Sequence, residues 1–152
     1  MTIGQTNFIM ICGGRNMTEK MREIMDYLQE CNNFFLATVE DGKPFVRPIS
    51  VLCEHNNKIY FISSNHKLVY DQIKQNGNVE ICGLNTHGSW VRINGKVAED
   101  ESREARIAIM DSDIDVISSV YSKEDDVMPA FYFENGTVRL CSAKGENKAI
   151  EL

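Results

Sequence analysis

Short β-type segments follow one another through most of this chain, and turn-forming residues separate them. Each segment is rich in aromatic and β-branched side chains, which favour strands. Strands joined by short turns pair antiparallel, and the helices are too few to cover both faces of a parallel sheet. The sequence therefore predicts a mainly β fold, an antiparallel barrel of six to seven strands with peripheral helices. The predicted strands are Phe34–Val39, Phe45–Glu54, Ile59–Ser63, Val79–Leu84, Trp90–Val97, Ala130–Glu134 and Thr137–Ser142.

Three residue pairs that end in glycine indicate sharp changes of direction. Asp41–Gly42 and Asn135–Gly136 tolerate the positive φ angles of tight hairpin turns, so we expect a hairpin at each. Asn94–Gly95 falls inside a predicted strand and indicates a bulge or a tight bend.

Peripheral helices are predicted from apolar residues at helical spacing. Between Thr18 and Glu30, four apolar residues recur at i, i+3, i+4 and i+7, and Asn16 or Thr18 can cap the helix. Further helices are expected at His66–Asn76, after a cap at Ser64–Asn65, and near Ser102–Met110 and Asp113–Ser122.

The length of 152 residues allows one domain with a sufficient core. We place this domain at residues 17–142. Residues 1–16 show no clean period and are interpreted as a flexible leader, with Met17 as an alternative start of the natural protein. Residues 143–152 are interpreted as a polar, mobile tail.

Charge and cysteine content exclude several classes of protein. The net charge of −6 argues against a broad basic face that binds nucleic acid. No run of 18 apolar residues is present, so we expect no membrane span. Five scattered cysteines and no secretory signal indicate a reducing, cytoplasmic location. The histidines lack metal-binding spacing, so no metal site is expected.

Pro48 interrupts the second predicted strand. Because proline cannot donate a hydrogen bond to its neighbour, this strand should be bulged or lie at a sheet edge around Arg47–Ser50. The unpaired backbone there could bind a ligand.

An anion-binding feature follows the third predicted strand. Ser63 and Ser64 offer hydroxyl donors just before the predicted helix, and Lys67 adds a full positive charge near its first turn. The stretch from Pro44 to Lys96 carries six basic and three acidic residues, a local +3. A phosphate group would suit this site, although the same residues can serve as an ordinary helix cap.

Two further residues have both a structural and a functional reading. Trp90, the only tryptophan, can be a core residue or an apolar wall beside an aromatic ligand. Cys82 reads more simply as a small buried residue than as a nucleophile.

In their order and spacing, these segments resemble the FMN-binding split-barrel family that is similar to pyridoxamine 5′-phosphate oxidase. The resemblance covers about Met17 to Ser142 and implies a split barrel. It rests on Phe34–Val39, Asp41–Pro44, Val46–Ser50, Ile59–Ser64 with Lys67, and Trp90–Val97.

The resemblance implies FMN as cofactor and a homodimer with each flavin between two subunits. It places Arg47, Pro48, Ile49 and Ser50 along the flavin ring and ribityl chain, Ser63, Ser64, His66 and Lys67 at the phosphate, and Trp90 against the flavin. The flavin itself carries the hydride chemistry, so no catalytic acid or base is demanded.

Several functions are compatible with this resemblance. We expect a small flavin oxidoreductase that uses reduced nicotinamide and acts on an unidentified small molecule. A flavin carrier or sensor without turnover is the alternative. Pyridoxamine 5′-phosphate oxidase activity itself is less expected, because the tail Gly145–Leu152 offers only Lys148 to hold a substrate phosphate. Haem or a deazaflavin would be rival ligands of the same barrel, but a haem site requires an axial histidine and nothing distinguishes His66 or His87 for that role. Single-stranded nucleic acid is disfavoured by the acidic net charge and by the lack of aromatic residues interleaved with basic ones.

Overall fold

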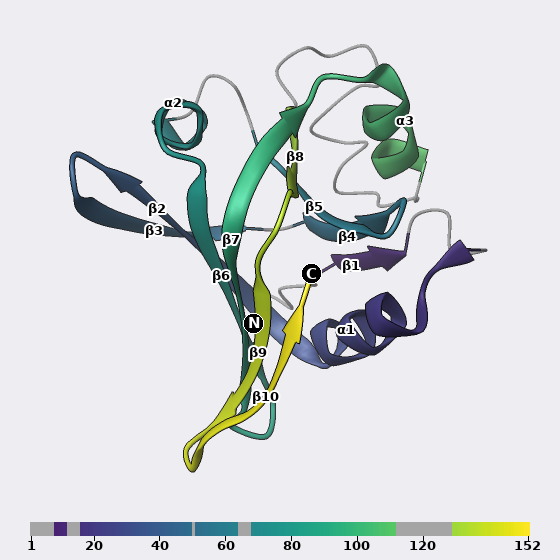
Figure 1. The fold of residues 1–152 in the computed structure, drawn as a ribbon, viewed down its shortest axis with the longest axis vertical. Helices are drawn as coiled ribbons and strands as arrows, with labels where there is room; N and C mark the ends of the chain where they lie inside the picture. Colours follow the sequence, from purple (N-terminus) through teal and green to yellow (C-terminus); the bar gives the residue numbers. More distant parts are fainter. Residues whose placement is uncertain (1–7, 12–15, 50, 64–67, 112–128) are drawn as a thin grey trace, which may run out of the picture.

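The computed structural model describes residues 8–11, 16–49, 51–63, 68–111 and 129–152, which contain ten strands and three helices (Figure 1). The helices are α1 (Glu19–Gln29), α2 (Leu68–Gln75) and α3 (Arg103–Asp111). The strands are β1 (Phe8–Ile11), β2 (Cys31–Glu40), β3 (Lys43–Ile49), β4 (Val51–His55), β5 (Lys58–Ile62), β6 (Asn78–Asn85), β7 (Trp90–Asp100), β8 (Ala130–Phe133), β9 (Thr137–Ser142) and β10 (Gly145–Glu151).

The strands form one strongly curled sheet whose order is β1-β4-β5-β8-β7-β6-β2-β3, with β9 and β10 branching from β7. All pairs are antiparallel except β1 with β4. The long strand β7 belongs to both halves of the sheet, because its end pairs with β8 and its beginning with β6 and β9 (Figure 1). The predicted antiparallel, mainly β split barrel is therefore confirmed.

The hairpin between β2 and β3 turns where the sequence predicts it. Asp41 and Gly42 have φ angles of 51° and 74°, as a tight two-residue hairpin requires. Glu40 pairs with Lys43 on either side of the turn. The hairpin projects from one side of the molecule, next to α2 (Figure 1).

The strand that contains Pro48 is irregular and lies at an edge, as predicted. It divides into β3 and β4 on either side of residue 50, which lies outside the described residues. β3 pairs with β2 alone among the described strands and ends the sheet.

The expected hairpin at Asn135–Gly136 is wrong. β8 and β9 do not pair with each other, because both run antiparallel to β7. Between them, the three residues 134 to 136 lie opposite only two residues of β7, 95 and 96. This is a β-bulge, for which an Asn-Gly pair is as suitable as for a turn. The bend expected at Asn94–Gly95 lies opposite this bulge. A Cβ atom at Gly95 would lie 2.0 Å from the carbonyl oxygen of Asn135, so the two backbones touch.

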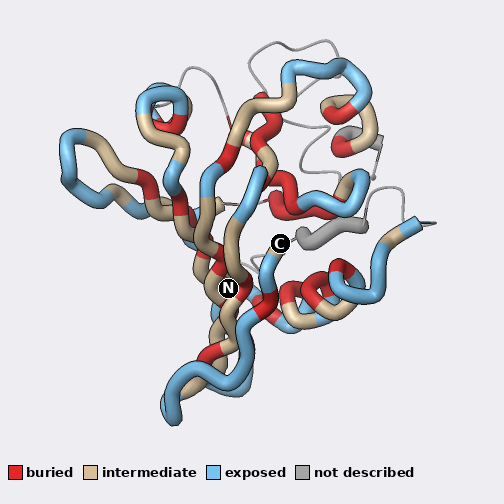
Figure 2. The backbone as a smooth tube through the Cα atoms, in the orientation of Figure 1, coloured by how far each residue is buried: buried red, intermediate tan, exposed pale blue. Residues whose placement is uncertain are grey.

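Two clusters of buried side chains hold the helices to the sheet (Figure 2). Helix α1 buries the predicted stripe of Met21, Ile24, Met25 and Leu28, and the side chain of Thr18 caps it by accepting from the N–H of Met21. α3 covers a second cluster through Ala105 and Ile109; its other buried members are Val51, Cys53, Tyr60 and Ala130. The helix expected at Asp113–Ser122 lies outside the described residues.

Both ends of the chain are more structured than the sequence indicated. Within the expected flexible leader, Phe8–Ile11 forms β1 beside β4. The prediction that residues 143–152 form a mobile tail is wrong, because Gly145–Glu151 forms β10 and pairs with β9. Ile150 is buried in the main core, which explains why this polar segment is held.

Candidate functional site

The edge strand β3 presents alternate residues to the two faces of the sheet. Arg47 pairs with Leu36 of β2, whose side chain is buried, so both point to the core side. Pro48 pairs with Phe35 and points to the opposite, outer side, where both are exposed. The predicted ligand-binding strand is therefore open along one edge among the described residues and has a basic residue on its inner face.

The Arg47 side chain lies between the β2–β3 hairpin and helix α2. Its Nη1 donates to the hydroxyl of Thr38 at 2.7 Å and to the carbonyl oxygens of Leu36 at 3.2 Å and Phe45 at 3.5 Å. Its Nη2 donates to Oε1 of Gln72 at 2.8 Å. Partial burial lowers the pKa of Arg47 from its usual value, but an arginine remains charged.

Two fully buried polar residues complete this contact. The hydroxyl of Thr38 donates to Oε1 of Gln72 at 2.6 Å, and the Gln72 amide nitrogen donates to Glu40 at 3.2 Å. We call Glu40, Gln72, Thr38 and Arg47 the β3–α2 clamp. Its hydrogen bonds give the buried polar groups of Thr38 and Gln72 their partners and fasten helix α2 to the β2–β3 hairpin.

Within the described part of the chain, no carboxylate contacts the guanidinium of Arg47. Among the described residues its acceptors are two carbonyls, a hydroxyl and an amide, all neutral. The nearby carboxylate of Glu40 binds Gln72 instead. A partly buried cation with no carboxylate partner among the described residues attracts an anion, so Arg47 fits a phosphate-bearing cofactor.

Only part of the predicted phosphate site can be placed. Ser63 follows β5, is almost fully buried, and donates its N–H to the carbonyl oxygen of Pro129 at 3.1 Å. Ser64, His66 and Lys67, and also Ser50 of the predicted ring site, lie outside the described residues. Helix α2 begins at Leu68, directly after this segment.

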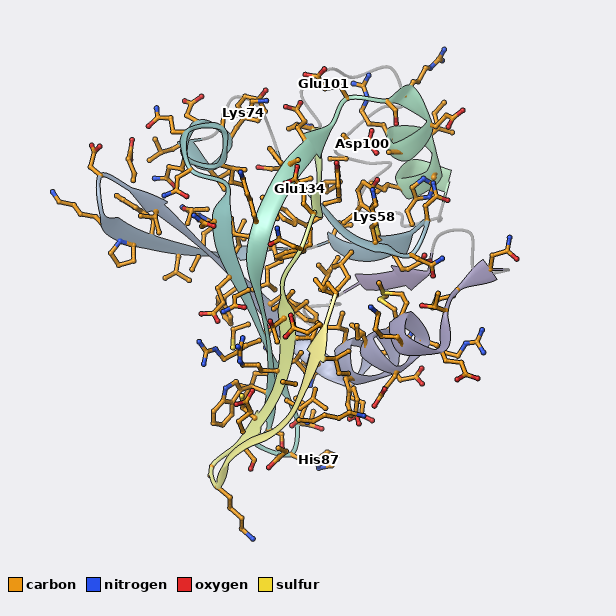
Figure 3. The ribbon with its side chains drawn as sticks, in the orientation of Figure 1. Lys58, Lys74, His87, Asp100, Glu101 and Glu134 are labelled. Atoms are coloured by element: carbon orange, nitrogen blue, oxygen red, sulfur yellow. The ribbon has the colours of Figure 1, made fainter. Side chains whose placement is uncertain are left out.

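Trp90 is not brought together with Arg47. It begins β7, three strands from β3, after the loop that carries His87, and His87 lies at the far end of the molecule from Lys74 of α2 (Figure 3). Trp90 borders a separate cavity of about 410 Å³, which is also lined by Tyr27 and Leu140. One chain therefore does not place Trp90 beside the clamp.

An apolar surface on the outer face of the sheet was not anticipated from the sequence. Phe35, Val46 and Leu84 are 42%, 69% and 47% exposed, and the strand register places all three on this face. Next to them a groove of about 730 Å³ contains the ion pair of Arg92 with Glu80 at 2.7 Å. We call the three apolar residues the outer patch. Alternation within Phe34–Val39 was the signal that could have revealed it.

Thr38 and Gln72 were also missed. Gln72 lies on the buried stripe of α2 between Val69 and Ile73, and a polar residue in such a stripe signals a buried hydrogen bond. Thr38 shows the same pattern on the buried face of β2.

Cys82 and the potential metal ligands are the remaining side chains of chemical interest. Burial raises the pKa of Cys82, in keeping with an unreactive thiol. Within the described ranges, no cluster of three or more His, Cys, Asp or Glu side chains could hold a metal, and no helix has the length and apolar character to span a membrane.

Comparisons with known proteins agree with this geometry. A family model described as pyridoxamine 5′-phosphate oxidase matches residues 17–139. A search of curated proteins found no match.

Solved structures share the fold. A NimC/NimA family protein from Clostridium acetobutylicum is 34% identical, with a TM-score of 0.80, over 88% of this chain and 94% of that protein. General Stress Protein 26 from Bacillus anthracis has a TM-score of 0.70 at 14% identity, over 89% and 100% of the two chains. A pyridoxamine 5′-phosphate oxidase-related, FMN-binding protein from Nostoc punctiforme has a TM-score of 0.60 at 16% identity, over 91% and 99%.

Proposed function

The chain belongs to the pyridoxamine 5′-phosphate oxidase family, and from this premise we propose that it is a flavoprotein that binds FMN. The charge of Arg47 carries the proposal: this side chain is held between the edge strand β3 and helix α2 and has no carboxylate partner among the described residues. The ring and ribityl chain would lie along the backbone of Arg47–Ile49 and Ser50, and the phosphate near Ser63, Ser64, His66 and Lys67. The Arg47 guanidinium, which is hydrogen-bonded to Gln72 of the helix that follows this segment, would also face the phosphate. The solved FMN-binding protein of the same fold supports this cofactor.

Flavin binding is tested on the purified protein. We expect FMN to remain bound after desalting and to give the visible absorbance of a flavin. Lys67→Ala should weaken FMN binding by roughly ten- to a hundredfold, the value of one charge-assisted contact, and riboflavin binding much less. A colourless protein that binds no FMN in calorimetry would contradict the proposal. A haem spectrum would show that the ligand is haem instead of FMN.

We also propose a homodimer whose second subunit completes the flavin site. The outer patch supports it, because three of the four exposed large apolar residues within the described ranges lie on this one face of the sheet. The fourth, Leu68, lies on α2 and is 55% exposed. Self-complementary packing of one face is the usual geometry of a homodimer.

The dimer is tested by charge substitutions of matched exposure. Leu84→Arg should convert the dimer to a monomer in light scattering, because it places a charge in the proposed interface. Leu68→Arg changes a leucine of similar exposure outside the patch and should leave the mass unchanged. A wild-type monomer, or equal behaviour of the two variants, would refute this interface.

For the reaction, we propose that reduced nicotinamide supplies a hydride to the bound flavin and that a small molecule accepts it. When bound, FMN supplies the hydride chemistry, and the protein supplies binding and orientation. Steady-state oxidation of reduced nicotinamide with an added acceptor tests turnover. Tight FMN binding without any oxidation would instead favour a carrier or sensor.

Pyridoxamine 5′-phosphate is not our proposed substrate. The C-terminal strand offers Lys148 as its basic residue, and this side chain forms an ion pair with Glu23 of α1. It is therefore engaged within the fold rather than open to a substrate phosphate.

We propose a cytoplasmic location as well. Cys31, Cys53, Cys82 and Cys141 are free thiols, and a reducing compartment would keep them so. Fractionation of the source cells tests this.

A further inference from the structure

The β3–α2 clamp holds an arginine with a glutamine where a carboxylate is close at hand. Gln72 uses its carbonyl oxygen to accept from Arg47 at 2.8 Å and its amide nitrogen to donate to Glu40 at 3.2 Å. The buried amide therefore stands between the cation and the carboxylate. Arginine usually pairs directly with a carboxylate, in a stronger and shorter contact. The interposed amide keeps the guanidinium fixed but not neutralised.

We propose that Gln72 is a positioning residue that determines specificity for the phosphorylated form of the flavin. Its neutral oxygen, together with the hydroxyl of Thr38, orients Arg47 while leaving its positive charge available to an anionic ligand. Gln72 itself does not touch the ligand. The inference rests on the proposed FMN site and adds to it the residue that makes Arg47 discriminate FMN from uncharged riboflavin.

The burial of the clamp explains why this arrangement matters. Thr38 and Gln72 are fully buried, and electrostatic interactions are stronger where water is excluded. A carboxylate in direct contact with Arg47 would cancel most of its field at short range. A carboxylate on the far side of an amide cancels less, because the interaction weakens with distance.

The test exchanges the amide and the carboxylate within the clamp. The double variant Gln72→Glu with Glu40→Gln keeps the net charge, and its side chains can form the same hydrogen bonds, but the carboxylate now contacts Arg47. Dissociation constants for FMN and riboflavin are measured by calorimetry on wild type, the double variant and Glu40→Gln alone. Melting temperatures report folding. If the double variant does not fold, Thr38→Val keeps the shape of the side chain but removes the hydroxyl that helps to orient Arg47, and it should weaken FMN binding more than riboflavin binding.

We expect the double variant to bind FMN about tenfold or more weakly, and riboflavin within about twofold of wild type, since one charge-assisted contact is neutralised. Glu40→Gln alone removes the more distant carboxylate, so it should bind FMN at least as tightly as wild type and riboflavin within about twofold of wild type. An unchanged ratio of FMN to riboflavin affinity would overturn the inference, and so would an equal loss for both, which would mark the clamp as merely structural. A wild-type protein that binds neither flavin would overturn the proposed function itself.

Discussion

Among the described glycines, Gly95, which contacts the bulge at Asn135–Gly136, should be the least tolerant of an added methyl group. A Cβ atom at Gly95 would lie 2.0 Å from the Asn135 carbonyl oxygen and 2.8 Å from Cα of Gly136. To reach ordinary contact at 3.4 Å, two backbones must separate by about 1.4 Å. Overpacking of this kind costs roughly 3 kcal/mol or more when backbone has to move. Gly95→Ala should lower the free energy of unfolding by that amount.

Gly88→Ala is the matched control. Gly88 has a φ of 80° and nothing within 4 Å of its added Cβ, so alanine there suffers only the left-handed strain of about 1–2 kcal/mol. Urea unfolding at one fixed protein concentration, followed by the fluorescence of Trp90, measures both variants. A loss for Gly95→Ala no larger than that for Gly88→Ala would refute the reasoning.

Two further predictions concern titratable groups. Burial opposes the charged form of Asp100, but hydrogen bonds from the hydroxyl of Tyr60 at 2.6 Å and from Ser102 outweigh it and lower its pKa. Because the folded pKa lies below the unfolded value of about 3.9, this carboxylate stabilises the protein above that pH. The difference in melting temperature between wild type and Asp100→Asn should shrink as the pH falls below about 4, and a constant difference down to pH 3 would contradict this. Burial raises the pKa of Cys31 to about 11, so iodoacetamide should label it slowly in the native protein and rapidly after unfolding, as mass spectrometry would show. Native labelling as fast as that of a small thiol would disprove it.

The sequence predicted those parts of the fold that depend on neighbouring residues. The Asp41–Gly42 turn and the stripe of α1 are set locally, and Pro48 limits its strand to an edge wherever that strand lies. Pairing between distant segments was not predictable in the same way. Asn135–Gly136 fits a turn or a bulge equally well. It forms a bulge because β8 and β9 both pair with β7 and not with each other.

In the candidate site, too, local features were predictable from the sequence and contacts between distant segments were not. The family resemblance placed Arg47 in the candidate site, but its partners Thr38 and Gln72 lie 9 and 25 residues away along the chain. Their role depends on which face of β2 and α2 is buried. Polar residues at otherwise apolar positions were visible in the sequence, although their partners were not.

Trp90 and Arg47 cannot contact the same flavin from one chain through the same face of the sheet. Arg47 points to the inner face with Leu36, whereas Trp90, paired with Leu84, points to the outer face. The two are separated by three strand spacings, about 14 Å, and Trp90 also lies three residues along β7 from Ile93, the residue level with Arg47. If both contact FMN, Trp90 must come from the second subunit. Mixing Arg47→Ala with Trp90→Leu subunits then produces dimers with one intact site, so flavin binding should recover to about a quarter of the wild-type stoichiometry after random exchange. No recovery, despite exchange of subunits, would show that both residues act within one chain or that Trp90 has no part in the site.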